Sequence, residues 1–135
     1  SRLDAIQAAM LSIKLRHLDG WNRHRRHVHQ AYLDVLAGTA VKTLKTLDGG
    51  DPVHHLEVIR VPDRDRVIAG LKAQGVATGI HYAHPCHKQP GFSRFDGRRL
   101  TVAETAADHQ LSLPMHPTLD LQRAKDVAEL VLELL

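Results

Sequence analysis

The residues best suited to chemistry gather in one stretch, which runs from Gly75 to Pro90 and reads GVATGIHYAHPCHKQP. Its first half has the bulky side chains and the glycines of a buried strand, which we expect from Val76 to Tyr82. Its second half contains Pro85, which cannot donate a backbone hydrogen bond to a sheet, so a loop must follow. Loops carried on rigid elements are where functional sites are commonly built. This loop holds the densest group of polar side chains in the chain: His81, His84, Cys86, His87, Lys88 and Gln89.

Histidine and cysteine side chains in one loop raise the question of a zinc site. Their spacing is H-x2-H-x-C-H, which lacks the paired ligands that orient a structural zinc, and prolines on both sides limit how the loop can wrap around an ion. We therefore favour a loop of site-facing residues without metal, with ordinary loop histidines as the alternative, and we assign no metal ligands in this chain. Cys86 as a nucleophile is a weaker hypothesis, because no acidic residue nearby could orient a histidine base.

A basic cluster invites a nucleic-acid hypothesis, since such clusters contact phosphates. It consists of Arg23, Arg25 and Arg26 with the histidines between and after them. No aromatic residues interleave with it as a stacking platform requires, so we favour a solvated helix face and predict no nucleic-acid partner. His54 and His55 lie in an apolar stretch, where packing with one satisfied hydrogen bond is a commoner role than catalysis. A glycine-rich phosphate loop is also missing, so the residues alone assign no reaction.

The composition is that of a single globular domain: of 135 residues, 43% are hydrophobic and 24% charged, with a net charge of +3. Aromatic residues make up only 4%, so the core must consist mainly of Leu, Val, Ile and Ala. No apolar run approaches the roughly 20 residues that span a membrane. The lone Cys86 excludes an internal disulfide and fits a reducing cytoplasm. The chain opens directly on a helical pattern, without Met or a leader, and we expect it to be a piece of a longer polypeptide.

Apolar residues at spacings of three and four predict a first helix from Leu3 to Leu18, buried on much of its circumference. Asp19-Gly20 should interrupt it before a second helix runs from Trp21 to Gly38. A single small sheet cannot cover so many apolar positions on the first helix. Without a further domain we therefore expect a contiguous apolar patch there, through which the chain self-associates.

Strands are predicted at 41–47 and 53–61, pairing antiparallel across the turn between them. Asp63 should cap a helix that ends at Gly75. Thr101 and Glu104 have the spacing of a capping box, which predicts a helix to about His109. A brief strand at 111–113 and a last helix from 118–120 to the C-terminus complete the order. This order predicts an α+β fold, with a small antiparallel-type sheet packed against helices.

Four stretches at consistent spacing resemble a known family: Ser1–Ala9 (SRLDAIQAA), Thr78–Tyr82 (TGIHY), His87–Pro90 (HKQP) and Leu111–Pro117 (LSLPMHP). They resemble the DegT/DnrJ/StrS-type sugar aminotransferases, which are pyridoxal-phosphate enzymes of fold type I. The resemblance covers essentially residues 1–135. It identifies them as the smaller, C-terminal domain, which follows a large cofactor-binding domain absent from this chain.

The resemblance implies transfer of an amino group, typically from glutamate, to a keto-sugar nucleotide, with pyridoxal phosphate as the electron sink. Such enzymes serve deoxyamino-sugar, antibiotic or cell-surface polysaccharide biosynthesis and work as homodimers with active sites at the subunit boundary. The Schiff-base lysine and the aspartate that pairs with the cofactor ring belong to the large domain, so no catalytic residue is expected here. The alternative is a non-catalytic interaction or regulatory module that kept the fold and lost the chemistry.

Individual roles follow from the same resemblance. Arg2 matches an arginine that approaches the cofactor phosphate of the partner subunit. His55 matches a histidine of a strand motif, and His81, Tyr82 and His87 match a segment near the sugar-nucleotide site. The chain departs from the pattern at three positions where the family more often has a small residue, a histidine or an aromatic: Pro52, His54 and Glu57.

Overall fold

The computed structural model describes residues 2–95 and 97–135, so Ser1 of the N-terminal motif lies outside the described residues. The elements follow in chain order: α1 (Ala5–Leu15), α2 (Leu18–Leu36), β1 (Lys42–Thr43), β2 (Glu57–Arg60), α3 (Arg64–Ala73), the 3-10 helices η1 (Cys86–Lys88) and η2 (Pro90–Phe95), α4 (Thr101–His109), β3 (Gln110–Leu113) and α5 (Leu121–Glu133). No helix of the described residues has the length and apolar composition to cross a membrane.

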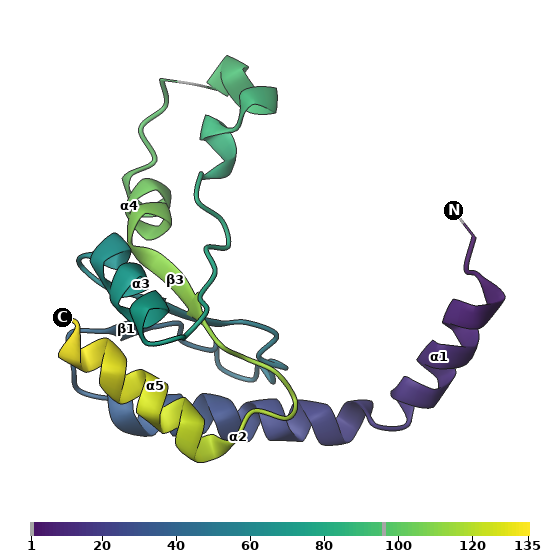
Figure 1. The fold of residues 1–135 in the computed structure, drawn as a ribbon. Coiled ribbons are helices and arrows are strands. Elements are labelled where there is room, and N and C mark those ends of the chain that lie inside the picture. The colour runs from purple at the N-terminus through teal and green to yellow at the C-terminus, as the bar shows by residue number, and fades with distance from the viewer. Residues whose placement is uncertain (1, 96) are drawn as a thin grey trace.

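The strands form a small antiparallel sheet in the order β1-β2-β3. Lys42 pairs with Arg60 at one edge, and Glu57 pairs with Leu113 at the other. Helices α2 and α5 run side by side below the sheet, while α3 lies beside β3 (Figure 1). The predicted fold class, helices against a small antiparallel sheet, is therefore confirmed.

The core forms where α2 and α5 meet the sheet. Side chains at three- and four-residue spacing line the inner face of α2, because this spacing returns to the same side of a helix. Tyr32 of this face donates its hydroxyl hydrogen to the carbonyl oxygen of Pro114 at 2.9 Å, and Nε2 of His24 donates to that of Leu119 at 2.7 Å. Helix α2 thereby fixes the connection between β3 and α5. The core residues with no exposed surface are Val28, Tyr32, Ile59, Val67, Leu71, Leu111, Ala124, Ala128 and Val131.

Two predicted helix starts and one stop are confirmed by their local chemistry. The side chain of Asp63 accepts a hydrogen bond from the backbone N–H of Arg66, and that of Asp120 accepts one from Arg123. These bonds satisfy N–H groups that have no partner within the helix. Gly75 follows α3 with a φ of 77°, a left-handed conformation that glycine adopts without steric cost.

The boundary between the first two helices was predicted in the wrong place. Helix α2 begins at Leu18 and continues through Asp19 and Gly20, and the chain breaks earlier, at Arg16–His17. An acidic residue in the first helical turn is favourable, and a glycine costs only about 1 kcal/mol, which the buried face of α2 outweighs.

Helix α1 is not buried in this chain, contrary to the prediction that much of its circumference is covered. None of its side chains is buried, and Ile6 on its apolar face is 73% exposed. Figure 1 shows the helix projecting from the end of α2, away from the sheet. The small sheet is already covered by α2, α3 and α5. It therefore has no surface left to cover α1, as anticipated from the sequence.

The stretch from Val76 to Tyr82 is not a strand. Only Gly79 joins the sheet, through an isolated bridge in which its N–H donates to the Ser112 carbonyl at 3.1 Å and its carbonyl accepts from the Ser112 N–H at 2.7 Å. Strands β1 and β2 are likewise shorter than predicted. With β3 only four residues long, β2 and the stretch 76–82 have few backbone groups to pair with.

The capping box at the start of α4 is only half present. Leu100 rather than Thr101 is the N-cap residue, and it makes no side-chain cap. The carboxylate of Glu104 does reach back, as the motif predicts, and accepts a hydrogen bond from the Leu100 N–H at 2.9 Å. The same side chain of Glu104 also contacts the candidate site.

Candidate functional site

The candidate site lies on a projecting segment, described at residues 81–95 and 97–100, which leaves the sheet and returns to α4. Figure 1 shows its 3-10 helices standing off from the rest of the molecule. The segment and α4 enclose a hollow of about 580 Å³. Three of the residues predicted to contact a sugar nucleotide, His81, Tyr82 and His87, line it together with Cys86 and Phe92.

Strand β3 positions the first two of these residues. Nδ1 of His81 shares a hydrogen bond of 2.9 Å with the hydroxyl of buried Ser112, and the Gln110 amide donates to the Tyr82 carbonyl at 2.9 Å. A Cβ atom on Gly79 would lie only 2.6 Å from the His81 ring, so this glycine is what allows the close approach. The Tyr82 side chain remains 75% exposed and available to another molecule.

His87 is buried, and its ring faces α4. Its Nε2 donates to Oε1 of Glu104 at 3.1 Å, the same oxygen that accepts the Leu100 N–H. The Leu100 N–H and then the His87 bond hold the pKa of Glu104 below its ordinary value. Glu104 therefore connects both ends of the projecting segment to α4, because His87 belongs to the outgoing end and Leu100 to the returning end.

The remaining predicted site residues lie elsewhere. His55 is exposed and lines a second hollow, formed by the segment that follows β1, the segment that leads into β2, and His29 of α2. Arg2 is exposed ahead of α1 and lines neither hollow. The structure thus brings His81, Tyr82 and His87 together, and leaves the roles of His55 and Arg2 as predictions.

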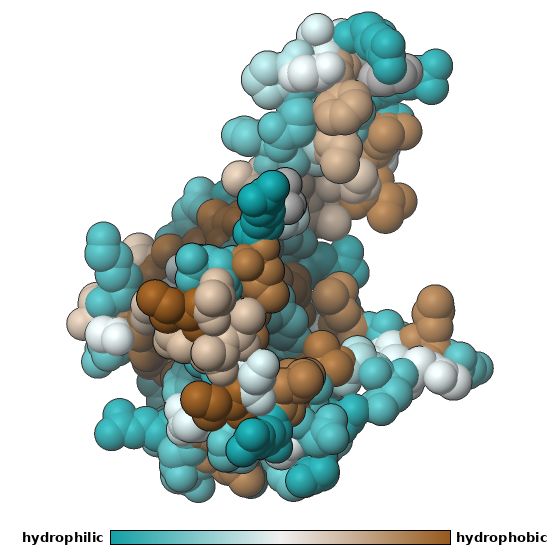
Figure 2. All heavy atoms as spheres, turned by 90° about the vertical axis from the view of Figure 1, so that its right-hand side faces the viewer, coloured by the Kyte–Doolittle hydropathy of each residue, from teal (hydrophilic) through white to brown (hydrophobic). Residues whose placement is uncertain are grey.

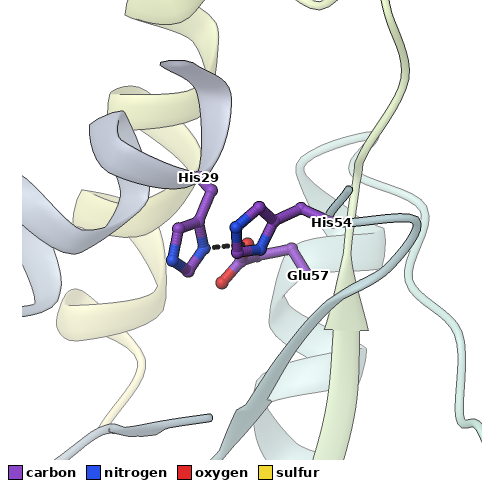
Figure 3. Close-up of side chains that lie close together, drawn as sticks. All are labelled: His29, His54 and Glu57. Carbon is purple, nitrogen blue, oxygen red and sulfur yellow. Dashed lines mark hydrogen bonds and ion pairs between the residues drawn. The ribbon is translucent and has the colours of Figure 1, made fainter. Parts of the chain in front are cut away.

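Sequence reasoning missed a compact cluster of His29, His54 and Glu57 (Figure 3). Nδ1 of His29 donates to Oε2 of Glu57 at 2.7 Å, and the two imidazole rings stack with their centroids 3.7 Å apart. Burial and then the nearby His29 lower the pKa of His54. One signal was available: Glu57 alternates with Ile59 along β2, which places both side chains on the core face.

The basic cluster on α2 is engaged locally. Arg26 forms an ion pair with Asp51 at 2.8 Å, and Arg25 donates to the Asn22 amide oxygen at 3.3 Å. Arg23 is exposed, but Arg25 and Arg26 are partly buried, so the cluster is only in part the predicted solvated helix face. The prediction of no nucleic-acid partner stays a prediction.

Residues 1–132 match the family described as DegT/DnrJ/EryC1/StrS aminotransferases. The chain belongs to this family. The predicted resemblance is confirmed, and with it the expectation that the parent family consists of enzymes. Among curated relatives, the chain is 35% identical to a dTDP-3-amino-3,6-dideoxy-alpha-D-galactopyranose transaminase of Aneurinibacillus thermoaerophilus, which aligns with 97% of this chain and 36% of that protein.

Two further relatives are more similar in sequence. A dTDP-3-amino-3,4,6-trideoxy-alpha-D-glucose transaminase of Streptomyces venezuelae is 39% identical, covering 98% of this chain and 36% of the relative. A pleiotropic regulatory protein of Geobacillus stearothermophilus is 43% identical, and the alignment covers 98% of this chain and 37% of that protein. The chain thus spans little more than a third of the length of the curated relatives it matches.

Solved structures of this aminotransferase family share the fold. The S. venezuelae enzyme DesV, in complex with a ketimine intermediate, matches with a TM-score of 0.86 at 36% identity, over 98% of this chain and 36% of that one. A DegT DnrJ EryC1 StrS aminotransferase from Brucella abortus matches with a TM-score of 0.88 at 30% identity and the same coverage. The chain therefore folds like about a third of a complete family member.

The described residues do not by themselves form a site for pyridoxal phosphate. That cofactor needs a lysine amine beside groups that hold its phosphate and ring. Five lysines are exposed and Lys125 is partly exposed, and they are spread from α1 to α5. Neither hollow offers a buried lysine, so the described residues do not fit the cofactor on their own.

Proposed function

We propose that this chain is the smaller, C-terminal domain of a pyridoxal-phosphate-dependent aminotransferase that acts on a keto-sugar nucleotide. The observation that carries the proposal is the family match over residues 1–132, combined with relatives named as transaminases of dTDP-linked amino sugars. Glutamate as amino donor, a cytoplasmic location and a homodimer belong to the same proposal. Products of this kind are building blocks of antibiotics or cell-surface polysaccharides.

In this proposal the projecting segment contacts the sugar nucleotide. Tyr82 offers an exposed aromatic face, and His81 offers an imidazole whose position is set by Ser112. Amphipathic rings suit a substrate that carries both a flat base and hydroxyl groups. His87 lines the same hollow and fixes the segment through Glu104.

His55 and Arg2 have roles that depend on the rest of the enzyme. We propose that His55 contacts the substrate from the second hollow, and that Arg2 reaches the cofactor phosphate of the partner subunit. The exposure of both side chains leaves them free for contacts outside this chain.

The alternative to the aminotransferase proposal is a regulatory or interaction module with the same fold, since one relative carries a regulatory name. The encoding DNA upstream of Ser1 separates the two. An open reading frame with a lysine-bearing cofactor domain supports the enzyme. A start codon next to Ser1, with no such domain encoded nearby, would contradict it.

In this proposal the Schiff-base lysine belongs to the large domain. We therefore expect that the 135-residue chain alone does not react with the cofactor at a specific lysine. The reason is that its lysines lie at or near the surface, apart from one another. Treatment with pyridoxal phosphate and borohydride, followed by peptide mass spectrometry, should show only low, scattered labelling. Stoichiometric labelling of a single lysine would place the catalytic centre inside this chain.

A further inference from the structure

A second group of reactive side chains lies apart from the projecting segment, between helix α2 and the segment that leads into β2. It consists of His29, His54 and Glu57, which point toward one another (Figure 3). One ligand atom from each residue lies within 4.8 Å of the other two. The imidazole rings of the two histidines are stacked, with planes that differ by 16°.

We propose that His29, His54 and Glu57 form a binding site for a divalent transition metal ion of the zinc type. Two imidazole nitrogens and one carboxylate oxygen are a ligand set that zinc, cobalt and nickel accept, with a remaining position open to water. Ligand atoms around a tetrahedral ion lie about 3.4 Å apart, because each bond is about 2.0–2.1 Å long. An ion bound by both histidines must lie in the plane of each ring, so the two imidazoles must turn out of their parallel stack when the ion binds.

Binding exchanges a proton for the ion. In the structure Nδ1 of His29 donates its hydrogen to Oε2 of Glu57 at 2.7 Å. The ion takes the place of that hydrogen between nitrogen and oxygen, and the proton leaves to solvent. The step involves no change of oxidation state and needs no other reactant.

Burial and charge favour an ion at this place. The Glu57 side chain is 3% exposed and that of His29 is 16% exposed, so the carboxylate lies in a poorly solvated environment. A buried carboxylate is costly unless a positive charge or hydrogen bonds compensate it. The nearby cation Arg26 is held by Asp51 at 2.8 Å, so its charge is already engaged. A divalent ion would compensate Glu57 directly.

The site also has an entrance. All three residues line the second hollow, of about 520 Å³, which opens to solvent beside His55. His54 reaches the cluster from a backbone with φ of 48°, a left-handed conformation that is uncommon for residues other than glycine and asparagine. Uncommon backbone of this kind persists where the surroundings hold it, and it often accompanies function.

This proposal departs from the sequence-based expectation of a chain without metal ligands. That expectation came from the spacing in the loop after Tyr82, which the new site does not use. Nothing in the sequence links His29 to His54, because they are 25 positions apart and only folding brings them together. The three ligands line the second hollow together with His55 and are separate from His81 and Tyr82. The test measures zinc affinity and not amino transfer, so its failure is distinguishable from failure of the proposed function.

The test is a titration of the full chain with zinc sulfate by isothermal calorimetry, repeated with cobalt and followed by absorption spectroscopy. We expect one equivalent of zinc, release of protons on binding and a tetrahedral cobalt spectrum. His54→Asn keeps the left-handed backbone, since asparagine tolerates it, but removes the imidazole. Loss of a direct ligand should weaken zinc binding by at least about tenfold to a hundredfold, as loss of outer partners already does.

His55→Asn is the matched control, because it removes an exposed neighbouring imidazole that is not among the three ligands. It should leave zinc affinity unchanged, as should Cys86→Ser in the projecting segment. Glu57→Gln should reduce affinity as His54→Asn does, and circular dichroism checks its folding. If Glu57→Gln does not fold, the comparison of zinc affinity between His54→Asn and His55→Asn tests the proposal. Failure of the wild-type chain to bind a stoichiometric ion, or equal loss in both asparagine variants, would overturn the proposal, as would loss only on Cys86→Ser.

Discussion

Glu104 is the single residue on which the geometry of the candidate site most depends. One carboxylate oxygen accepts hydrogen bonds from His87 at 3.1 Å and from the Leu100 N–H at 2.9 Å. The other lies 3.8 Å from the ammonium of Lys88. Since these partners come from both ends of the projecting segment, the carboxylate limits how far the segment can move relative to α4.

Glu104→Gln should loosen the projecting segment without unfolding the core. The amide keeps the shape of the side chain but loses the charge that strengthens both hydrogen bonds. We expect proteolysis or amide hydrogen exchange within residues 81–100 to become several-fold faster, while the thermal midpoint of the core changes little. Glu129→Gln, at an exposed position on α5, is the control and should leave exchange in the segment unchanged.

The hydrogen bonds of Glu104 make the stability of the projecting segment depend on pH. The folded pKa of Glu104 lies below its unfolded value of about 4.3, so its stabilisation is present above that pH and is lost as the pH falls through the folded pKa. Protection from exchange in the segment, measured relative to the intrinsic exchange rate at each pH, should therefore fall on acidification in the wild type and much less in Glu104→Gln. Equal acid sensitivity in both proteins would show that Glu104 does not hold the segment.

Single residues also show where sequence reasoning stops. The histidines after Gly79 could be selected from composition and from their resemblance to a family, and His81, Tyr82 and His87 indeed line one hollow. Glu104 could not be identified from the sequence as the hydrogen-bond partner of His87, because its capping-box pattern predicted only a bond to the N-terminus of its own helix. His29 could not be selected either, because its role depends on a carboxylate from a strand that packs against its helix.

At the scale of elements, α2 organises the fold by contacting α5, the sheet and the connection between β3 and α5. Tyr32 is buried at the centre of this arrangement and donates to the Pro114 carbonyl. Burial, and then the charge of Glu57, raise the pKa of the Tyr32 hydroxyl far above its ordinary value. Ionisation of this hydroxyl is therefore coupled to unfolding.

Tyr32→Phe should lower the free energy of unfolding by about 1–2 kcal/mol at neutral pH, because the Pro114 carbonyl loses its donor. Its pH dependence should be weaker than that of the wild type. A raised folded pKa means that stability is fully present below the unfolded pKa of about 10 and is lost as the pH rises above it. Urea unfolding from neutral to alkaline pH measures both effects. A wild type and variant with parallel alkaline losses would contradict the account.

Helices were predicted better than strands, for a physical reason. The caps at Asp63 and Asp120 and the turn at Gly75 depend on a few neighbouring residues, and the structure contains each of them. A strand depends on a partner elsewhere in the chain. The stretch 76–82 has strand-favouring residues, yet β3 offers it a single bridge at Ser112, so most of it remains outside the sheet.

At the scale of the whole molecule, the exposed side of α1 is the most prominent feature. Figure 2, which views the molecule from the side on which α1 lies, shows hydrophobic side chains gathered on this surface. Leu3, Ile6, Met10 and Ile13 all have more than half of their surface exposed, as expected for a helix whose cover belongs to another domain or subunit. A patch of this kind marks an interaction surface or an aggregation hazard.

We therefore expect the isolated chain to self-associate through α1. Sedimentation over a concentration series should show a concentration-dependent rise in mass, and Met10→Glu should abolish it by placing a charge in the apolar contact. Ser12→Glu adds the same charge away from the stripe formed by Ile6 and Met10, and should have a weaker effect. A wild-type chain that stays monomeric at high concentration would show that α1 does not mediate association.

The central claim, that this chain is part of a sugar-nucleotide aminotransferase, is tested most directly by amino transfer itself. The protein encoded by the complete reading frame is incubated with pyridoxal phosphate, isotopically labelled glutamate and a dTDP-linked keto sugar, and the products are analysed by mass spectrometry. We expect the label to pass to the sugar nucleotide, and we expect Tyr82→Ala and His81→Ala to slow the transfer while the cofactor stays bound. A protein that binds the cofactor but transfers no nitrogen to any keto-sugar nucleotide tested would contradict it.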